Sequence, residues 1–255
     1  MTPTTTQESL GIFPELAGTR RFTVDEYHRL IDAGILGKYD KVELLDGYVV
    51  YKADYPELQP TDTAFPEWRA LRPWSSAEYH RMFDLGILAR DEKLELLDGY
   101  LVLKMGQSNA HRGAVLRLAA NLPARLPAGW LVMTQMPVSV GIMDPEPDGS
   151  VVRGALADYD ARDVVEADFG IVIEVSDSTL GMDRVAKGRL YARAGIPGYW
   201  IVNVADRQIE VYTNPDTAAD PPAYRTRTDY RHGDAVPITL DGNAVGAIPV
   251  SELLP

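Results

Sequence analysis

The sequence contains no cysteine, although it has 255 residues. This absence excludes disulfides and thiolate metal sites, and it is typical of a protein of the reducing cytoplasm, where we expect this chain to act. The first 20 residues lack the basic start and apolar core of a signal peptide. No apolar run approaches the roughly 20 residues that cross a membrane, so we expect no membrane partner.

A basic region is also lacking, and the net charge is −12. Residues 1–105 hold 12 Lys/Arg against 18 Asp/Glu, and residues 106–255 hold 13 against 19, so each part carries −6. Proteins that bind nucleic acid through charge alone need many phosphate contacts. The composition therefore argues against such a protein, but not against an enzyme that approaches phosphate through a metal ion.

A repeat at an offset of 52 residues is the clearest internal feature. DEYHRLIDAGILGKYDKVELLDGYVVYK (25–52) returns as AEYHRMFDLGILARDEKLELLDGYLVLK (77–104). Each copy predicts a helix and then a hairpin, because a Ser or Thr with Glu three residues on opens each helix pattern and Asp-Gly separates two apolar runs. We predict a flexible N-terminus at 1–19, a degenerate helix-hairpin copy at 20–55, a linker at 56–71 and one domain at 72–255.

Helix and strand patterns alternate after the second copy. A helix at 108–126, strands at 129–141, 149–154 and 168–177, a helix at 181–195 and two strands within 198–214 follow one another. This order predicts an α/β fold with an α-β-β-β-α-β core and a mixed central sheet. Residues 223–240 predict one further edge hairpin.

Two acids interrupt the apolar strand patterns. Asp148 stands at the mouth of one predicted strand, and Glu174 lies inside the next among Ile and Val. A buried carboxylate costs several kcal/mol unless it is paired, and two neighbouring carboxylates repel. A shared Mg²⁺ or Mn²⁺ ion would remove both costs. For Asp148 alone, a Pro-Asp-Gly turn is the alternative.

The helix after Glu174 offers a cation. Asp183, Lys187 and Tyr191 are spaced by four residues and share one face. We expect the next face to pack on the sheet; it is formed by Met182, Ala186, Leu190 and Ala194. Lys187 would then reach the metal site and stabilise the charge that develops on a phosphate. The alternative is that Asp183 and Lys187 form an ordinary surface pair.

Several segments resemble a known family. ELLDGYLVLK, AHRGAV, TQMPVSV, PEPDGSVVRG and IVIEVSDSTLGMDRVAKGRLYARAGIPGYWIVNV occur in this order. The stretch from Arg72 to Thr213 resembles the Uma-two family of restriction-endonuclease-like proteins, within the PD-(D/E)XK nuclease superfamily. The resemblance implies a restriction-endonuclease-like core with a metal-dependent phosphodiesterase site.

The resemblance also implies roles for individual residues. Asp148 matches the first-motif acid, and Glu174 matches the acid of the Glu-Xaa-Lys motif. Ser176 stands where that motif has lysine, and Lys187 matches the lysine that some branches carry on the following helix. The resemblance gives the backbone carbonyl of Val175 as a further metal ligand.

Four residues are auxiliary candidates: Asp183, which shares a helix face with Lys187, and three that rest on the resemblance. Glu95 and His111 match positions that recur near the site, and Gln135 could contact substrate. The alternatives are a local salt bridge for Glu95, a capping or solvent-facing role for His111 and a polar strand-edge role for Gln135. In the first copy Glu43 corresponds to Glu95, but no second site follows it. That copy covers a sheet edge, mediates dimerisation or is a remnant of duplication.

Two functions of different classes fit these observations. The first is a Mg²⁺-dependent DNA endonuclease, which Asp148, Glu174 and Lys187 favour. The second is a weak or inactive nuclease-fold protein that acts as a binding or regulatory module, which the charge of −12 and the absent in-strand lysine favour. A hydrolase of another phosphoester also stays open. The expected partner is nucleic acid, namely DNA, and a homodimer is left open.

Overall fold

The computed structural model describes residues 18–60, 68–104, 106–136 and 145–254. Most of the predicted flexible segment at 1–19 therefore lies outside the described residues. The chain divides into two compact units, one up to Leu94 with Gly99–Leu103 and the other with Glu95–Asp98 and the chain from Lys104 on. This division passes through the second copy of the repeat. The domain start at residue 72 stays a prediction.

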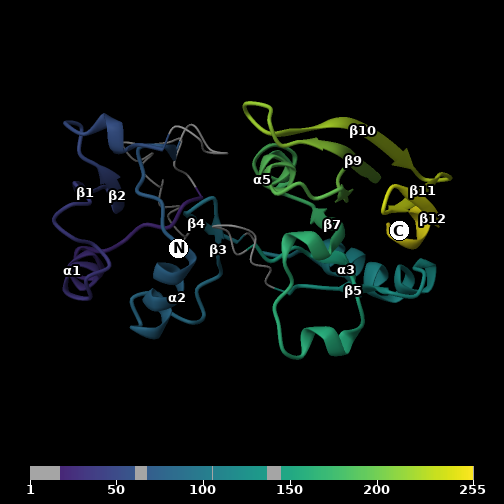
Figure 1. Ribbon diagram of the computed structural model, residues 1–255, viewed down its shortest axis with the longest axis horizontal. Coiled ribbons are helices and arrows are strands. Elements are labelled where there is room, and N and C mark those ends of the chain that lie inside the picture. Colours follow the sequence, from purple (N-terminus) through teal and green to yellow (C-terminus); the bar gives the residue numbers. More distant parts are fainter. Residues whose placement is uncertain (1–17, 61–67, 105, 137–144, 255) are drawn as a thin grey trace, which may run out of the picture. The chain divides into compact units, whose positions relative to one another are not determined.

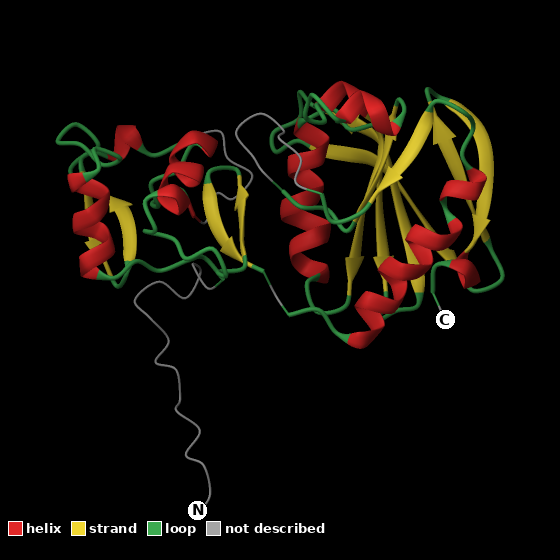
Figure 2. Ribbon diagram, turned by 90° about the horizontal axis from the view of Figure 1, so that it is seen from below, coloured by secondary structure: helices red, strands yellow, loops and turns green. Residues whose placement is uncertain are grey.

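Both copies of the repeat hold the same elements at an offset of 52 residues. They are α1 (Val24–Asp32), β1 (Val42–Leu45) and β2 (Tyr48–Tyr51), and then α2 (Ser76–Asp84), β3 (Leu94–Leu97) and β4 (Tyr100–Leu103). Strands β1 and β2 pair with each other, as do β3 and β4, and Figure 2 shows the two separate hairpins. Each copy is thus a helix followed by a hairpin.

Local sequence explains where these elements begin and turn. Thr23 caps α1 and Ser75 caps α2, each in a capping box with the Glu three residues on. The hairpins turn at Asp46-Gly47 and Asp98-Gly99, where all four residues have positive φ. That conformation is the one for which Asp-Gly is favoured in two-residue turns.

The second unit is built around a six-stranded sheet in the order β10-β9-β8-β7-β6-β5. Its elements are α3 (Asn109–Asn121), β5 (Trp130–Met133), β6 (Gly149–Arg153), β7 (Phe169–Ser176), α4 (Leu180–Met182), the π-helical turn η7 (Asp183–Lys187), α5 (Gly188–Arg193), β8 (Gly198–Asn203), β9 (Gln208–Asp216), β10 (Ala223–Arg231), β11 (Ala235–Leu240) and β12 (Asn243–Pro249). Strands β7 and β8 are parallel, and the other neighbours are antiparallel. The mixed sheet and the α-β-β-β-α-β order were both predicted.

Short 3-10 turns connect the main elements. They are η2 (Pro56–Leu58), η4 (Pro123–Arg125), η5 (Leu156–Tyr159), η6 (Glu166–Asp168) and η8 (Val250–Glu252). No helix in the described ranges is long and apolar enough to cross a membrane.

Helices cover both faces of the sheet, with α3 and α5 on opposite sides of β7 (Figure 1). Leu118 of α3 packs in one apolar core with Ile171 and Ile173. On the other face, the ring of Tyr191 in α5 lies 5.0 Å from that of Tyr199 in β8. All eight residues of β7 are buried, as expected for a central strand that is covered twice.

One expectation about the second unit is wrong. Residues 223–240 do not form their own hairpin, because β10 pairs with β9 while β11 pairs with β12. The segment predicted as a helix at 181–195 is helical from Leu180 to Arg193, with the π turn η7 inside it. Of the face expected to pack on the sheet, Ala186 and Leu190 are buried and Met182 and Ala194 are half-buried, while Asp183, Lys187 and Tyr191 of the polar face are buried too.

Candidate active site

Strand register brings the two predicted acids to one end of the sheet. Gly149 pairs with Ile173, so Asp148 comes directly before the paired end of β6 and Glu174 directly after the partner residue in β7. The two acids are close enough for Asp148 to act electrostatically on Glu174. The backbone N–H of Val175 donates to Oδ2 of Asp148 over 2.8 Å, which fixes this carboxylate against β7.

The same hydrogen bond orients the backbone carbonyl of Val175. In an extended strand, the N–H and C=O of one residue point toward the same neighbouring strand. Since the N–H of Val175 points to Asp148, its carbonyl also points toward that side of β7. The carbonyl predicted as a ligand is therefore on the Asp148 side of the strand.

Glu174 is almost fully enclosed, with 3% of its surface exposed. The hydroxyl of Tyr191 donates to its Oε1 over 2.8 Å, and the Lys187 ammonium lies 3.0 Å from the same oxygen. Burial raises the pKa of Glu174 to about 8; Lys187 opposes this change, and Asp148, Asp183 and Glu95 add to it. The carboxyl therefore favours either a proton or a cation beside it.

Lys187 stands at the end of η7 among three carboxylates. Its Nζ lies 3.0 Å from Glu174, 3.5 Å from Glu95 and 3.9 Å from Asp183. Burial by itself would lower the pKa of Lys187, but attraction to these carboxylates outweighs burial and raises the pKa well above its ordinary value. Lys187 is thus a buried cation at neutral pH.

Asp183 belongs to the same buried group. It accepts a hydrogen bond from the Thr179 hydroxyl over 2.6 Å, and its backbone carbonyl accepts one from the Tyr199 hydroxyl over 3.0 Å. Burial raises its pKa, although Lys187 and Thr179 act against this. Because Asp183 and Lys187 are both buried, they are not an exposed surface pair.

Glu95 enters the group from the β3 hairpin. Its Oε1 lies 3.6 Å from Lys104, and its Oε2 lies 3.5 Å from Lys187. Lys104 also pairs with Glu146. Asp98, at the turn of the hairpin, pairs with Arg193 of α5 over 2.6 Å and anchors this segment. Glu95 therefore makes both the local salt bridge and a contact with the predicted catalytic lysine.

His111 lies in the first turn of α3 and supports Asp148. The Ser108 hydroxyl accepts from the His111 backbone N–H, which makes Ser108, not His111, the capping residue. Nε2 of His111 lies 3.0 Å from Oδ2 of Asp148. Since a carboxylate can only accept, Nε2 is the donor in this contact. Nδ1 is buried without a hydrogen-bond partner among the described residues.

Gln135 is not part of this group. It follows β5 with a φ of 51°, and its side chain is exposed. No contact joins it to Asp148 or Glu174 in the described part of the chain. Its predicted role as a substrate contact stays a prediction.

Sequence reasoning missed two features of this face of the sheet. The first is the hydrogen bond from Tyr191 to Glu174, which the spacing of four residues after Lys187 could have indicated. The second is Glu210, which lies in the same row as Glu174 because each pairs with Ile201. Glu210 is fully buried and bound by Arg184 over 2.5 Å and Arg227 over 3.3 Å.

A metal ion at this site would rest on few protein ligands. The described residues hold no group of three or more His, Asp or Glu side chains placed to bind a metal. The donor set is the carboxylates of Asp148 and Glu174 with the Val175 carbonyl. Mg²⁺ uses one or two carboxylates together with waters and substrate phosphate, so this oxygen set fits such an ion.

Comparisons with known proteins identify the family and support the fold. The family model Uma2, described as "Putative restriction endonuclease", matches residues 76–244. Among solved structures, the chain is similar to "a putative nuclease belonging to DUF820" from Anabaena variabilis ATCC 29413, with 14% identity and a TM-score of 0.50 over 71% of this chain and 97% of that chain. At this identity the likeness shows the fold alone. No curated protein matches the chain.

Proposed function

The chain belongs to the Uma2 family, and from this premise we propose that it is a Mg²⁺-dependent endonuclease that hydrolyses phosphodiester bonds of DNA at Asp148 and Glu174. The observation that carries the proposal is the state of Glu174, a carboxyl buried on a nuclease fold beside Lys187 and within electrostatic reach of Asp148. Strongly perturbed acids of this kind cluster at functional sites.

The protein groups have separable tasks in this proposal. Asp148, Glu174 and the Val175 carbonyl would hold the ion, which when bound would supply an activated water and neutralise phosphate charge. Lys187 offers a fixed ammonium to the charge that develops on the phosphate. Tyr191 holds the Glu174 carboxylate through its hydroxyl.

His111 is a positioning residue for Asp148. Its Nε2 holds Oδ2, the same oxygen that the Val175 N–H binds, so this carboxylate has little rotational freedom. Fixing a ligand in this way is how neighbouring groups tune a metal site. Glu95 acts on Lys187, since its carboxylate lies 3.5 Å from the ammonium.

One observation favours the binding or regulatory alternative. Lys187 already neutralises Glu174 across 3.0 Å, so the acid is paired without any metal ion. Ser176, which is fully buried, replaces the in-strand lysine. A protein that had lost turnover could keep this self-paired arrangement as a structural feature.

A cleavage assay separates the two functions. The purified chain is incubated with supercoiled, linear and single-stranded DNA, with Mg²⁺ or Mn²⁺ and with chelator. We expect metal-dependent cleavage that Glu174→Gln and Lys187→Met each reduce by about 10²-fold or more, the scale for losing one group that stabilises the transition state. The control is Asp163→Asn, which changes an exposed acid. Cleavage that survives Glu174→Gln would contradict the proposed site, and DNA binding without cleavage would favour the alternative.

A further inference from the structure

The two copies of the repeat exchange backbone hydrogen bonds within the first unit. We use "first copy" for residues 18–51 and "second copy" for residues 70–103. The segment ahead of α1 pairs with β4, because the Arg20 N–H donates to the Leu101 carbonyl and the Leu103 N–H donates to that of Gly18, each over 2.8 Å. This segment therefore forms an antiparallel bridge, between Thr19 and Val102, on the hairpin of the other copy.

The reverse exchange is present at the same offset. The Arg72 N–H donates to the Val49 carbonyl, and the Tyr51 N–H donates to that of Ala70, each over 2.9 Å. Each of these residues lies 52 positions from its counterpart in the first exchange. The segment ahead of α2 thus pairs with β2 as the segment ahead of α1 pairs with β4.

Ion pairs repeat the reciprocal pattern. Arg20 binds Glu26 of its own copy over 2.7 Å and Glu92 of the second copy over 2.9 Å. Arg72 binds Glu78 of its own copy over 2.7 Å and Asp40 of the first copy over 3.3 Å. Both guanidinium groups are buried. Each copy therefore depends on an acid that the other copy supplies.

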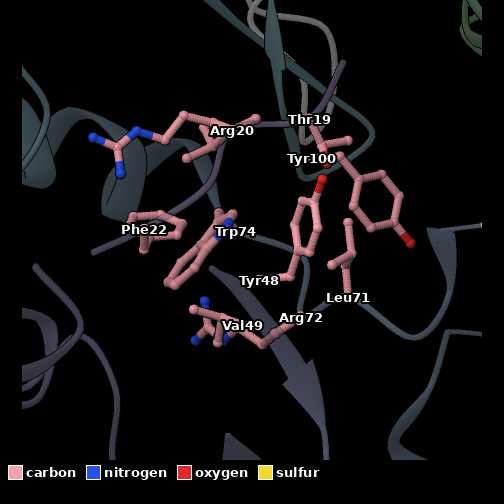
Figure 3. Close-up of a pocket in the computed structure, with 10 residues that line it drawn as sticks. Thr19, Arg20, Phe22, Tyr48, Val49, Leu71, Arg72, Trp74 and Tyr100 are labelled. Atoms are coloured by element: carbon pink, nitrogen blue, oxygen red, sulfur yellow. The ribbon is translucent and has the colours of Figure 1, made fainter. Parts of the chain in front are cut away.

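A pseudo-two-fold axis passes between the copies, at the small cavity shown in Figure 3. The ten residues that line the cavity are five pairs at an offset of 52, namely Thr19 and Leu71, Arg20 and Arg72, Phe22 and Trp74, Tyr48 and Tyr100, and Val49 and Leu101. Its volume of about 20 Å³ has room for a single water molecule. The surface is therefore an interface between the copies and not a ligand pocket.

The pairing has the geometry of a homodimer interface. In an isologous interface, one patch meets a second copy of itself, so every contact occurs twice. Here the strand pairing and the arginine pairs each occur twice. The aromatic contact at the axis joins equivalent positions, since the rings of Phe22 and Trp74 lie 5.5 Å apart.

We infer that the first unit is a homodimer interface enclosed within one chain, in which the first copy occupies the surface through which the second copy would bind another copy of this chain. The inference rests on the first unit alone and is independent of the proposed nuclease activity.

The second copy carries a complete set of groups for pairing with itself. Glu92 meets Arg20 through two hydrogen bonds of 2.9 and 3.0 Å, whereas Asp40 meets Arg72 through one of 3.3 Å. A pair of second copies would contain two contacts between Arg72 and Glu92. Two-point contacts between guanidinium and carboxylate are the stronger kind, so the second copy should self-associate once the first copy is displaced.

The test uses the full chain, whose mass is 28.1 kDa. Arg20→Glu places a third carboxylate beside Glu26 of the first copy and Glu92 of the second copy, and it leaves Arg72 and Glu92 intact. We expect size-exclusion chromatography with light scattering to show a monomer for the wild type and about twice that mass for Arg20→Glu over a dilution series. Adding Arg72→Glu should restore the monomer, because second copies would then also repel. Arg90→Glu is the control, since its side chain is 79% exposed and pairs with the similarly exposed side chain of Asp84.

A second variant removes the effect of side-chain size at the axis. In a pair of second copies, two Trp74 rings would meet where Phe22 and Trp74 now meet, and their combined volume would be larger. The double variant with Arg20→Glu and Trp74→Phe places two Phe rings there instead, which avoids this crowding. If both variants stay monomeric at every concentration, the inference is overturned. It is also overturned if the wild type is a dimer that Arg20→Glu dissociates, because the copies would then pair between chains.

Discussion

Glu174 and Glu210 are two buried acids on one face of one sheet, yet their surroundings act on them in opposite ways. They pair with the same residue, Ile201, from either side and are 3% and 0% exposed. Burial raises the pKa of Glu174 to about 8. Burial also acts on Glu210, but hydrogen bonds from Arg184, Asn203, Tyr212 and Gln208 outweigh it and lower its pKa to about 2.

The two acids differ in how far neighbouring groups compensate their negative charge. Glu210 is surrounded by donors and by the cations Arg184 and Arg227, so its charge is fully compensated by protein groups. Glu174 shares the single Lys187 ammonium with Glu95 and Asp183 and faces Asp148. Excess negative charge in a buried site is costly unless another cation enters. The Glu210 cluster is therefore neutralised by protein groups alone, whereas the proposed cation site depends on the excess negative charge around Glu174.

The largest effect on stability should come from Glu210. Glu210→Gln keeps the shape but leaves the Arg184 and Arg227 guanidinium groups without their carboxylate. We expect a loss of roughly 3 kcal/mol in the free energy of unfolding, near the lower end for a broken buried ion pair because both arginines are partly exposed. Chemical denaturation of the variant and the wild type measures this loss in the free energy of unfolding. Glu174→Gln should not destabilise the metal-free protein comparably, and equal losses in both variants would remove the distinction.

The pH dependence of stability should differ in sign between the two acids. Because the folded pKa of Glu174 is raised from 4.5 to about 8, the folded state binds more protons within that window. Glu174 therefore makes stability fall as pH rises from about 5 to 8. For Glu210, lowered to about 2, stability is present above its unfolded pKa and is lost as pH falls toward 2.

Denaturation profiles across pH check this prediction. Relative to the wild type, Glu174→Gln should flatten the decline between about pH 5 and 8, and Glu210→Gln should flatten the loss on the acid side. A Glu174→Gln profile parallel to that of the wild type between these values would contradict the raised pKa.

The smallest effect should follow from Tyr191→Phe. This change removes one hydrogen bond to Glu174 and keeps the ring that packs on Tyr199. We expect a loss of about 1 kcal/mol in the free energy of unfolding. If Tyr191 positions Glu174, the variant should also weaken Mn²⁺ binding in calorimetry. An unchanged metal affinity would reduce Tyr191 to a packing role.

Much of this fold could be predicted from the sequence, because its signals are local. The apolar run of β7, the Asp-Gly turns and the capping Thr23 and Ser75 each depend on neighbouring residues, and the family and the mixed core sheet are confirmed. The placement of Lys187 beside Glu174 was also expected, although the catalytic roles of these residues stay predictions.

What the sequence could not show depends on tertiary contacts. A period of 3.6 residues does not reveal the π turn that contains Asp183 and Lys187. The alternation of residue types along β9 does not reveal that the face of the sheet that carries Glu210 is buried. The reciprocal pairing of Arg20 with Glu92 joins residues 72 positions apart, and no local pattern indicates it.

The measurement that tests the central claim most directly is a thermal melt with and without Mn²⁺. Wild type, Asp148→Asn, Glu174→Gln, Glu210→Gln and Asp163→Asn are compared. A site that binds the ion only when folded should stabilise the wild type by RT ln(1 + [L]/Kd), or about 2.7 kcal/mol when the ion is at about a hundred times its Kd. The account predicts that Asp148→Asn and Glu174→Gln lose this shift, while Glu210→Gln and Asp163→Asn keep it. Equal metal shifts in all five proteins would mean that the acidic surface binds the ion diffusely, and would contradict a cation site at Glu174.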